Sequence, residues 1–275
     1  MNLAFCSFSS GSSGNCYLIK TDKTAVLIDA GISATRILKE LDRTDTPQDK
    51  VEGLFLTHEH VDHVTGSRVL LKRLKNAQVF ASPGTFEGTI RRDAADPHSF
   101  EKEIDRDRRI SISPDEAVKV GDLTIRAFRT LHDAGDPYGY CISNGGKSIA
   151  VLTDTGTITE EMVDNIAGAD VLVLEANHDT ELLRCGSYPP YLKRRILSDY
   201  GHLSNSQAAD ALLRLFGSFE KKRVVLLAHL SAENNTPAIA ERTVLTALAR
   251  EGRYTGSDLY MGVLLRDEAS LLYRL

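Results

Sequence analysis

The stretch Thr57-His58-Glu59-His60-Val61-Asp62-His63 constrains this chain more than any other, because it places three imidazoles and two carboxylates within six positions. Imidazole and carboxylate are the side chains that hold borderline divalent metals. The run Leu54-Phe55-Leu56 before it is typical of a buried strand, and the spacing Leu70-Leu71-Leu74 after it predicts a helix. We therefore expect a loop between a strand and a helix that turns several of these side chains toward one metal-binding point.

The spacing inside this stretch excludes one common zinc motif. Helix-borne zinc sites carry two histidines at positions i and i+4, but the fourth residue after His58 is Asp62. An extended segment instead puts His58 and His60 on one side, while Asp62 and His63 enter the first turn of the following helix. The alternative, a solvated polar loop, does not account for so dense a set of ligand-type side chains.

Three further ligand-type residues directly follow predicted strands. His132 ends the strand 123–131, Asp154 follows the strand 149–152, and His229 ends the strand 224–228. A centre with two metals needs about seven protein ligands, and these three complete the set His58, His60, Asp62, His63, His132, Asp154 and His229. Asp29 follows another predicted strand, where it is either a residue that orients a liganding imidazole or a turn-forming aspartate.

The order of predicted elements indicates the fold class. A β-rich start with interspersed helices is followed by five β segments between residues 110 and 152, and then helix and strand alternate. Without an internal repeat or a break in composition, we predict one α+β domain, residues 1–275, in which two sheets pack face to face with helices outside. The polar stretch from about Asp93 to Arg109, which contains His98, is expected to be an exposed insertion.

Composition indicates the size of the core and the cellular compartment. With 275 residues, 42% of them hydrophobic, the chain can bury a substantial core, and no apolar run approaches the length of a membrane span. The N-terminus resembles a first strand rather than a signal peptide. Four scattered cysteines without a CxxC pair suit small buried residues in a reducing compartment, so we expect a cytoplasmic protein.

Charge limits the range of partners. The net charge of −5 argues against broad non-specific binding of nucleic acid but leaves room for a local basic groove. The chain has four basic clusters, each more typical of a solvated face than of a binding patch: Arg91-Arg92, Arg106 to Arg109, Lys193-Arg194-Arg195 and Lys221-Lys222-Arg223.

The stretch 57–63 and its three later partners resemble the HxHxDH signature and following motifs of the metallo-β-lactamase superfamily of hydrolases. The resemblance spans residues 29 to 229 and implies a four-layer αβ/βα sandwich of two packed mixed β-sheets. It implies two divalent metal ions, zinc or manganese, since all ligands are nitrogen and oxygen. The implied assignment gives His58, His60 and His132 to one metal and Asp62, His63 and His229 to the other, with Asp154 bridging and Asp29 supporting.

Two more stretches resemble phosphodiesterase members of the superfamily, above all the tRNA 3′-processing endonucleases. Glu175-Ala176-Asn177-His178 follows an apolar strand, and Tyr200-Gly201-His202 leads into a helix. The resemblance implies that Glu175 and His202 form a dyad that protonates the leaving oxygen, which an alkoxide leaving phosphate needs. The other interpretation of His202 is a helix-capping polar residue. His178 is either a phosphate contact or a surface histidine.

The intervals from Asp154 to Glu175 and from Glu175 to His202 leave little room for the tRNA-gripping arm of those endonucleases, and the interval from Asp154 to His229 is too short for the inserted domain of the β-CASP nucleases. The chain looks most like the compact YycJ/WalJ-like nuclease group, whose opening Ser-Gly-Ser-Ser-Gly-Asn-Cys-Tyr-Leu-Ile it shares. This opening loop is either a plain hairpin turn or a contact for substrate oxygens through Ser12, Ser13 and Asn15, with His178 and His202 as further phosphate contacts.

The resemblance implies hydrolysis of a nucleic-acid phosphodiester, with DNA exonuclease activity as the leading hypothesis. A metal-bridging hydroxide would attack phosphorus, and the implied catalytic residues are Asp62, Glu175 and His202. The alternatives are a small-molecule or cyclic-nucleotide phosphodiesterase, an RNA-processing nuclease, and an ester or thioester hydrolase. A binding module without activity is disfavoured because no ligand position is missing. The sequence does not determine the native metal, the polarity of cleavage, the oligomeric state or the protein partners.

Overall fold

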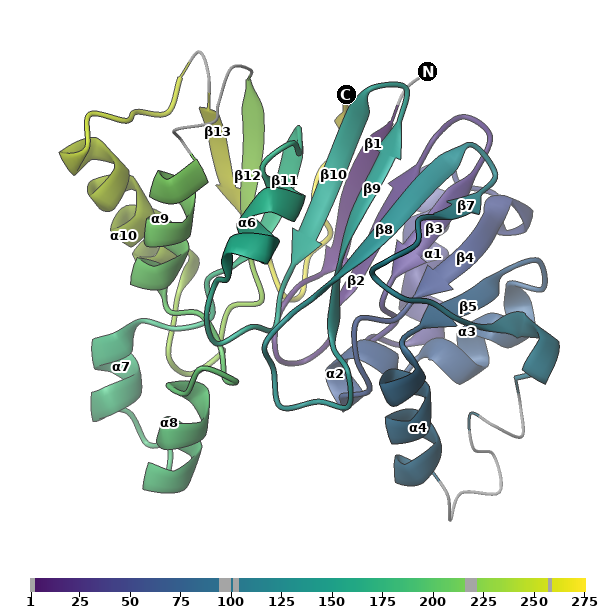
Figure 1. The fold of residues 1–275 in the computed structure, drawn as a ribbon, viewed down its shortest axis with the longest axis horizontal. Coiled ribbons are helices and arrows are strands. Elements are labelled where there is room, and N and C mark those ends of the chain that lie inside the picture. The colour runs from purple at the N-terminus through teal and green to yellow at the C-terminus, as the bar shows by residue number, and fades with distance from the viewer. Residues whose placement is uncertain (1–2, 94–99, 101–103, 216–221, 257–258) are drawn as a thin grey trace.

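The structure is a computed structural model that describes residues 3–93, 100, 104–215, 222–256 and 259–275. Its centre is a pair of seven-stranded sheets packed face to face (Figure 1). The first sheet has the order β14-β1-β2-β3-β4-β5-β6. Its strands are β1 (Ala4–Ser9), β2 (Cys16–Lys20), β3 (Ala25–Ile28), β4 (Val51–Phe55), β5 (Gln78–Ala81), β6 (Arg109–Ser111) and β14 (Tyr273–Arg274).

The second sheet has the order β13-β12-β11-β10-β9-β8-β7. Its strands are β7 (Val118–Val120), β8 (Leu123–Arg129), β9 (Tyr138–Asn144), β10 (Lys147–Leu152), β11 (Val171–Glu175), β12 (Arg223–Ala228) and β13 (Leu259–Val263). Both sheets are mixed: β3 to β6 and β10 to β13 pair in parallel, and the remaining neighbours pair antiparallel. Parallel strands end at the same edge, so each sheet gathers several strand ends at one place.

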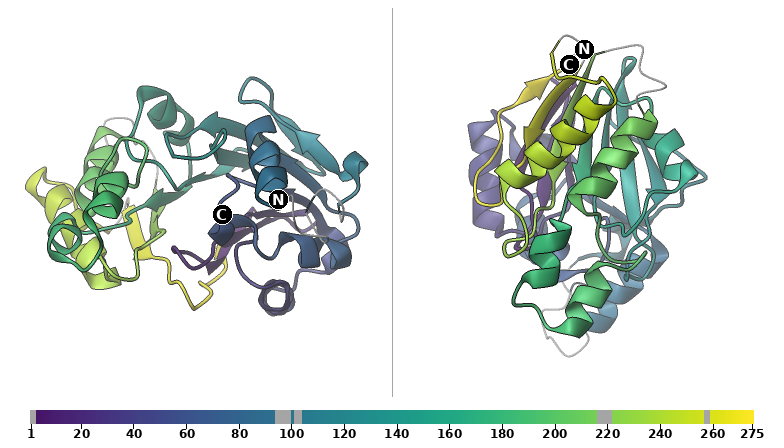
Figure 2. Two further views of the ribbon diagram at one scale, coloured as in Figure 1. Left: turned by 90° about the horizontal axis from the view of Figure 1, so that it is seen from below. Right: turned by 90° about the vertical axis from the view of Figure 1, so that its left-hand side faces the viewer.

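Helices cover the two outer faces, and Figure 2 shows the sheets between them. The first sheet carries α1 (Ala34–Arg43), α3 (Ser67–Arg73) and α4 (Pro83–Arg92). The second carries α6 (Glu160–Ile166), α9 (Asn205–Leu215) and α10 (Pro237–Arg250). The short elements are η1 (Gln48–Lys50), α2 (Val61–Val64), η2 (Arg106–Arg108), α7 (Thr180–Cys185) and α8 (Pro190–Ile196). The predicted four-layer sandwich of two mixed sheets is confirmed.

Alternating side chains explain why each sheet is buried on both faces. In β2, Tyr17 and Ile19 point to the core between the sheets, while Cys16 and Leu18 point to the outer helices. The same alternation holds in β11, where the two valines face inward and the two leucines face α6 and α9. Strands buried on both faces read as continuous apolar runs rather than as alternating ones, which is how they appear in the sequence.

Two predictions about the elements need correction, and one helix was not predicted. The unpredicted helix is α7, which is six residues long and begins at the Asp179 side-chain cap. The last strand is β14, Tyr273–Arg274, rather than residues 271–273. The stretch predicted as an exposed insertion is partly packed, because Phe100 and Ile104 are buried against the first sheet's outer core; His98 lies outside the described residues.

The structure bears on two expectations from the sequence, the absence of a membrane span and the burial of the cysteines. In the described part of the chain, no helix is long and apolar enough to cross a membrane. Cys6 and Cys16 are buried as expected, but Cys185 at the end of α7 is exposed, so burial does not describe all four cysteines.

Phe55 of β4 contacts side chains of both sheets, so its replacement tests the packing of the core between them. Its ring is fully buried, stacks on Phe80 at a centroid distance of 4.4 Å and meets Tyr140 of the second sheet edge-on at 5.5 Å. Replacing Phe55 with alanine is expected to lower the free energy of unfolding by roughly 3–5 kcal/mol, through lost burial and the cavity left behind. Urea unfolding followed by fluorescence measures this loss.

The matched control is Leu271→Ala, since Leu271 is 79% exposed. That change is expected to alter the free energy of unfolding by no more than about 0.5 kcal/mol. Equal unfolding midpoints for Phe55→Ala and the wild type would contradict the packing described for the two sheets.

Candidate metal centre

The loop after β4 is held in place by the buried carboxylate of Asp29, which lies at the end of β3. Asp29 accepts hydrogen bonds from the Thr57 backbone N–H at 2.8 Å and the Thr57 hydroxyl at 2.9 Å. The His63 Nδ1–H donates to the same carboxylate at 2.7 Å. Since Nδ1 of His63 is hydrogen-bonded to Asp29, Nε2 is the nitrogen turned to the histidine and aspartate cluster. A carboxylate that accepts a hydrogen bond from one ring nitrogen commonly orients the other nitrogen toward a metal.

Gly31 allows the loop to come this close to β3. A side chain at Gly31 would place its Cβ only 1.7 Å from the carbonyl oxygen of Asp62. The Asn15 N–H donates to that same carbonyl at 2.8 Å. Close approach of backbone is a use of glycine that a sequence pattern does not reveal, so the role of Gly31 was missed.

The structure brings the seven predicted metal ligands together as two groups of three, with Asp154 between them. His58, His60 and His132 offer nitrogen atoms within 4.8 Å of one another, and so do Asp62, His63 and His229 with their ligand atoms. Asp154 lies between the groups: its Oδ1 is 3.4 Å from His229 Nε2 and 3.9 Å from His132 Nε2, and its Oδ2 is 3.4 Å from His63 Nε2.

Two candidate ligands that follow strands share an uncommon backbone conformation with the supporting Asp29. Asp29, Asp154 and His229 have φ angles of 59°, 59° and 55°. Side chains other than glycine enter this left-handed region at a cost of about 1–3 kcal/mol each, and such residues cluster at functional sites. These three residues lie one or two positions after β3, β10 and β12, where the strands end.

The chemistry of the donor set fits divalent metal ions. His58 Nε2, Asp154 Oδ2 and His229 Nδ1 are buried without a hydrogen-bond partner in the described structure. Burial, with the neighbouring His63, holds the pKa of His58 well below its ordinary value, so His58 stays neutral, the form in which imidazole binds a metal. A cluster of buried histidines and aspartates with unpartnered atoms suits hard and borderline divalent cations.

Glu175 and His202 lie beside this cluster and contact each other. The His202 Nδ1–H donates to Glu175 Oε1 at 2.7 Å, and the same nitrogen is 3.8 Å from Asp154. The other oxygen of Glu175 accepts from the Thr155 N–H at 3.0 Å, which fixes the carboxylate. Burial disfavours the charged imidazolium, but the Glu175 carboxylate outweighs burial and raises the pKa of His202.

His202 does not cap α9, which was the other interpretation of this residue. The capping residue is Ser204, whose hydroxyl accepts from the Gln207 N–H at 3.3 Å while Gln207 Oε1 accepts from the Ser204 N–H at 2.9 Å. This reciprocal pair is a capping box.

The residues predicted to contact phosphate differ in their exposure to solvent. Ser12 and Ser13 are exposed at the tip of the loop after β1. Asn15 is fully buried, and its amide donates to His63 Nε2 at 3.1 Å and to the Gly11 carbonyl at 3.1 Å. The prediction of a phosphate contact is wrong for Asn15, because its side chain is turned to the protein.

His178 is not a surface histidine, since it is only 1% exposed. Both of its ring nitrogens are buried without a hydrogen-bond partner among the described residues. Burial, together with the nearby charge of His202, lowers the pKa of His178 to about 4. A neutral imidazole enclosed in this way has no direct access to a phosphate in solution.

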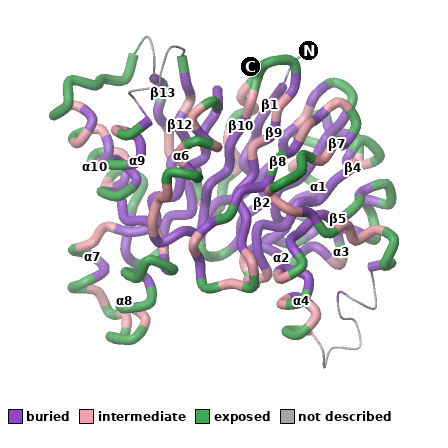
Figure 3. The backbone as a smooth tube through the Cα atoms, in the orientation of Figure 1, coloured by how far each residue is buried: buried purple, intermediate pink, exposed green. Residues whose placement is uncertain are grey.

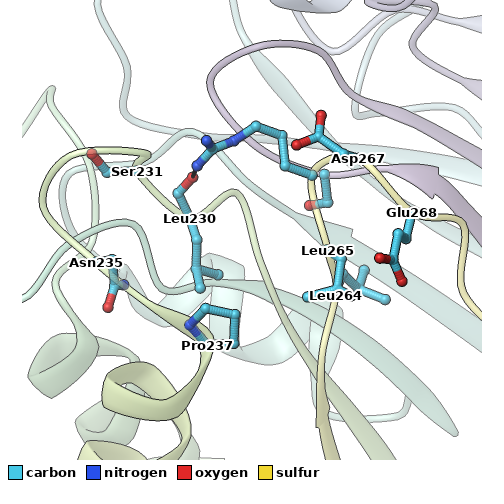
Figure 4. A pocket seen from close by; sticks show the side chains of 10 residues that line it. Leu230, Ser231, Asn235, Pro237, Leu264, Leu265, Asp267 and Glu268 are labelled. Carbon is cyan, nitrogen blue, oxygen red and sulfur yellow. Dashed lines mark hydrogen bonds between the residues drawn. The ribbon is translucent and has the colours of Figure 1, made fainter.

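A separate cavity of about 250 Å³ lies next to the loop that follows β12 (Figure 4). Leu230, Pro237 and Leu264 supply apolar walls, with Asp267 and Glu268 at the rim. None of the histidines of the metal centre lines it. It is smaller than the roughly 300–1,000 Å³ that is usual for ligand sites, so we assign it no substrate.

A two-sheet sandwich with helices outside and a buried His/Asp cluster at the strand ends defines the class of metal-dependent hydrolases. The model of the "Beta-lactamase superfamily domain" matches residues 24–230. The chain is 36% identical over 250 residues to "Exodeoxyribonuclease WalJ" of Streptococcus pneumoniae serotype 2 (strain D39 / NCTC 7466), covering 91% of this chain and 90% of that protein.

Two further comparisons agree. The chain is 34% identical over 252 residues to "Exodeoxyribonuclease YycJ" of Bacillus anthracis, covering 92% of this chain and 91% of that protein. The crystal structure of the metallo-β-lactamase fold protein YhfI from Bacillus subtilis superposes with a TM-score of 0.70 at 15% identity, covering 100% of this chain and 99% of that one. The chain belongs to the metallo-β-lactamase superfamily and is a hydrolase, as the sequence resemblance predicts.

The hydrogen bonds of Asp29 generate a prediction about metal affinity. Asp29→Asn keeps the size of the side chain and tolerates the left-handed backbone, but it removes the charge that holds the His63 Nδ1–H. Loss of such an orienting group is expected to weaken metal binding by roughly 10–100-fold. Competition with a chromophoric chelator measures the dissociation constant.

Asp45→Asn is the matched control, since Asp45 also has a positive φ, 50°, but is exposed and outside both ligand groups. Its metal affinity should equal that of the wild type. If Asp29→Asn also binds metal as tightly as the wild type, Asp29 does not orient the ligands.

Proposed function

We propose that this hydrolase is an exonuclease that removes nucleotides from DNA, with two divalent metal ions, zinc or manganese, at the centre described above. His58, His60 and His132 would hold one ion, Asp62, His63 and His229 the other, and Asp154 would contact both. Bound divalent ions supply positive charge to phosphate oxygens and acidity to a water nucleophile. The donor set, the two groups and the shared Asp154 support this assignment.

The observation that carries the proposal is the pair Glu175 and His202, 2.7 Å apart at the edge of the metal centre. Thioester hydrolysis releases a thiolate, a weakly basic group that leaves without a proton donor. Cleavage of a phosphodiester releases an alkoxide, which needs a proton donor. Because Glu175 holds Nδ1 and raises the pKa of His202, Nε2–H remains to donate that proton near neutral pH.

The position of the dyad relative to Asp154 is fixed by the backbone. Thr155, the next residue after Asp154, donates its N–H to Glu175 Oε2. Leu203, the next residue after His202, donates its N–H to the same oxygen at 3.4 Å. The proposed general acid, His202, is therefore held at a fixed position relative to Asp154, a candidate metal ligand. Such fixed positions matter because the nucleophile and the leaving group lie on opposite sides of phosphorus, and the groups that assist them must be held in register.

DNA is the substrate favoured by the two relatives described above, whose names call them exodeoxyribonucleases. Ser12 and Ser13 at the exposed loop tip are retained as candidate contacts to the phosphate chain. All four cysteines are free, which suits a reducing compartment, so we place the activity in the cytoplasm.

The dyad predicts a dependence on the leaving group. His202→Ala should lower turnover of DNA by roughly 10²–10⁴-fold, because the departing alkoxide loses its proton donor. Turnover of bis(p-nitrophenyl) phosphate should fall much less, since nitrophenolate leaves without a proton. Steady-state kinetics of both substrates with the metal-loaded protein test this; equal losses on the two substrates would remove His202 from the role of general acid.

The substrate assignment has a direct test. Metal-loaded protein is expected to shorten end-labelled DNA stepwise, and to do so faster than it shortens RNA of the same sequence. Gel electrophoresis of single- and double-stranded substrates labelled at either end shows the products and the polarity. Protein that splits a small phosphodiester but leaves every labelled polynucleotide intact would contradict the proposed function and favour a small-molecule phosphodiesterase.

A further inference from the structure

We infer that the exposed face of α8, together with Tyr200, is a binding track for unpaired nucleotides of the strand that enters the metal centre. The inference rests on the proposed function and deepens it, because it names the single-stranded end as the form of nucleic acid that contacts the protein. The residues concerned are Tyr191, Arg194, Arg195 and Tyr200.

The helix α8 has one inward and one outward face. Ile196 is only 7% exposed and anchors the inner face. Tyr191, Arg194 and Arg195 stand at positions i, i+3 and i+4, so they share a face. All three are exposed, and Figure 3 shows α8 exposed over much of its length. Tyr191 itself is 69% exposed, so its ring is accessible to a ligand.

Asp133 connects this face to the metal centre. The Arg195 guanidinium forms a two-point ion pair with Asp133, in which Nη2 donates to Oδ1 at 2.8 Å and Nε donates to Oδ2. Asp133 directly follows His132, and His132 Nε2 lies 3.4 Å from the Asp133 carboxylate. The outward face of α8 is therefore joined, through one residue, to a candidate metal ligand.

The backbone after α8 approaches the same point. The Asp133 N–H donates to the carbonyl of Tyr200 at 3.1 Å, and His132 Nδ1–H donates to the carbonyl of Gly201 at 2.9 Å. Tyr200 is 57% exposed and lies two residues before His202. Arg195 and the Tyr200 backbone are thus joined to the metal centre through Asp133, and Tyr191 and Arg194 continue the same face of α8 away from it.

These side chains match the chemistry of an unpaired strand. Every base has a π-face that can stack on an aromatic ring, and basic side chains nearby follow the phosphates. Arg194 makes no hydrogen bond or ion pair that joins it to another described residue, so its charge is available to a phosphate. A duplex conceals the faces of its bases, so exposed stacking rings next to the catalytic dyad favour a frayed or single-stranded end.

The alternative occupant of this face is a protein partner. Exposed tyrosine and arginine residues are also frequent in protein interfaces. The connection through Asp133 to His132 favours the substrate, since it joins this face to a candidate metal ligand.

The test compares removal of the rings with removal of only their hydroxyl groups. In metal-loaded protein, Tyr191→Ala and Tyr200→Ala are each expected to raise KM for a single-stranded, end-labelled oligonucleotide roughly 5- to 100-fold. Tyr191→Phe and Tyr200→Phe keep the stacking faces and should stay within about twofold of the wild type. The control Tyr254→Ala changes a tyrosine that is 72% exposed between α10 and β13, and should leave KM unchanged. In Figure 1 the chain after α10 runs at the upper left, whereas α8 lies at the lower left.

Two further measurements separate stacking from general damage. KM for bis(p-nitrophenyl) phosphate gauges the metal centre alone, and its rise in the alanine variants should be at least fivefold smaller than the rise for the oligonucleotide. Arg194→Gln should reduce the slope of log binding constant against log salt by about 0.7, the value for one phosphate contact on a single strand. Fluorescence anisotropy with a phosphorothioate oligonucleotide measures that slope.

The outcomes distinguish the two proposals. A wild-type protein that degrades DNA, with alanine variants whose KM for the oligonucleotide equals that of the wild type, overturns the track and leaves the proposed function intact. That result would assign the α8 face to another partner. Phenylalanine variants as impaired as the alanine variants would also overturn the track, because they exclude stacking. A wild type that degrades no polynucleotide overturns the proposed function, and the track with it.

Discussion

The buried carboxylate of Asp154 is the interaction on which the rest of the centre depends. It is 2% exposed, and its two oxygens face imidazole nitrogens of His229 and His63, each at 3.4 Å. Burial disfavours its charge, yet the surrounding histidines hold the pKa of Asp154 well below its ordinary value. An isolated buried carboxylate would be strongly destabilising. The two ligand groups are therefore one electrostatic unit, and neither can be rearranged without leaving Asp154 uncompensated.

The same carboxylate links the candidate metal ligands to the pair Glu175 and His202, to which we assign acid catalysis. Thr155 follows Asp154 and donates to Glu175, and Glu175 in turn orients His202. A histidine surrounded by cations would tend to lose its proton, but a dedicated carboxylate offsets that tendency locally. The superfamily's fold thus accommodates a proton donor next to positive charge because the strand ends of β10 and β11 lie side by side in a parallel pair.

Much of this arrangement was predictable, and the remainder was not for identifiable reasons. Continuous apolar runs located the central strands, and ligand-type residues placed directly after them located the candidate site. The left-handed turns at Asp29, Asp154 and His229 were not predicted, since nothing local distinguishes them from ordinary loop residues. Asn15 was misassigned because its partners, Asp62 and His63, lie more than forty positions away. The helix α7 was missed because six residues are too few for a periodic signal.

The division of the site between the sheets has a consequence for synthesis of the protein. His58, His60, Asp62 and His63 follow β4 of the first sheet, whereas His132, Asp154 and His229 follow strands of the second. A chain emerging from the ribosome completes the first cluster early, but it completes the seventh position only after β12 has been made and the halves have docked. The seven candidate ligands therefore come together only after both sheets have formed and packed against each other, so metal binding at this site reports completed folding of the whole chain.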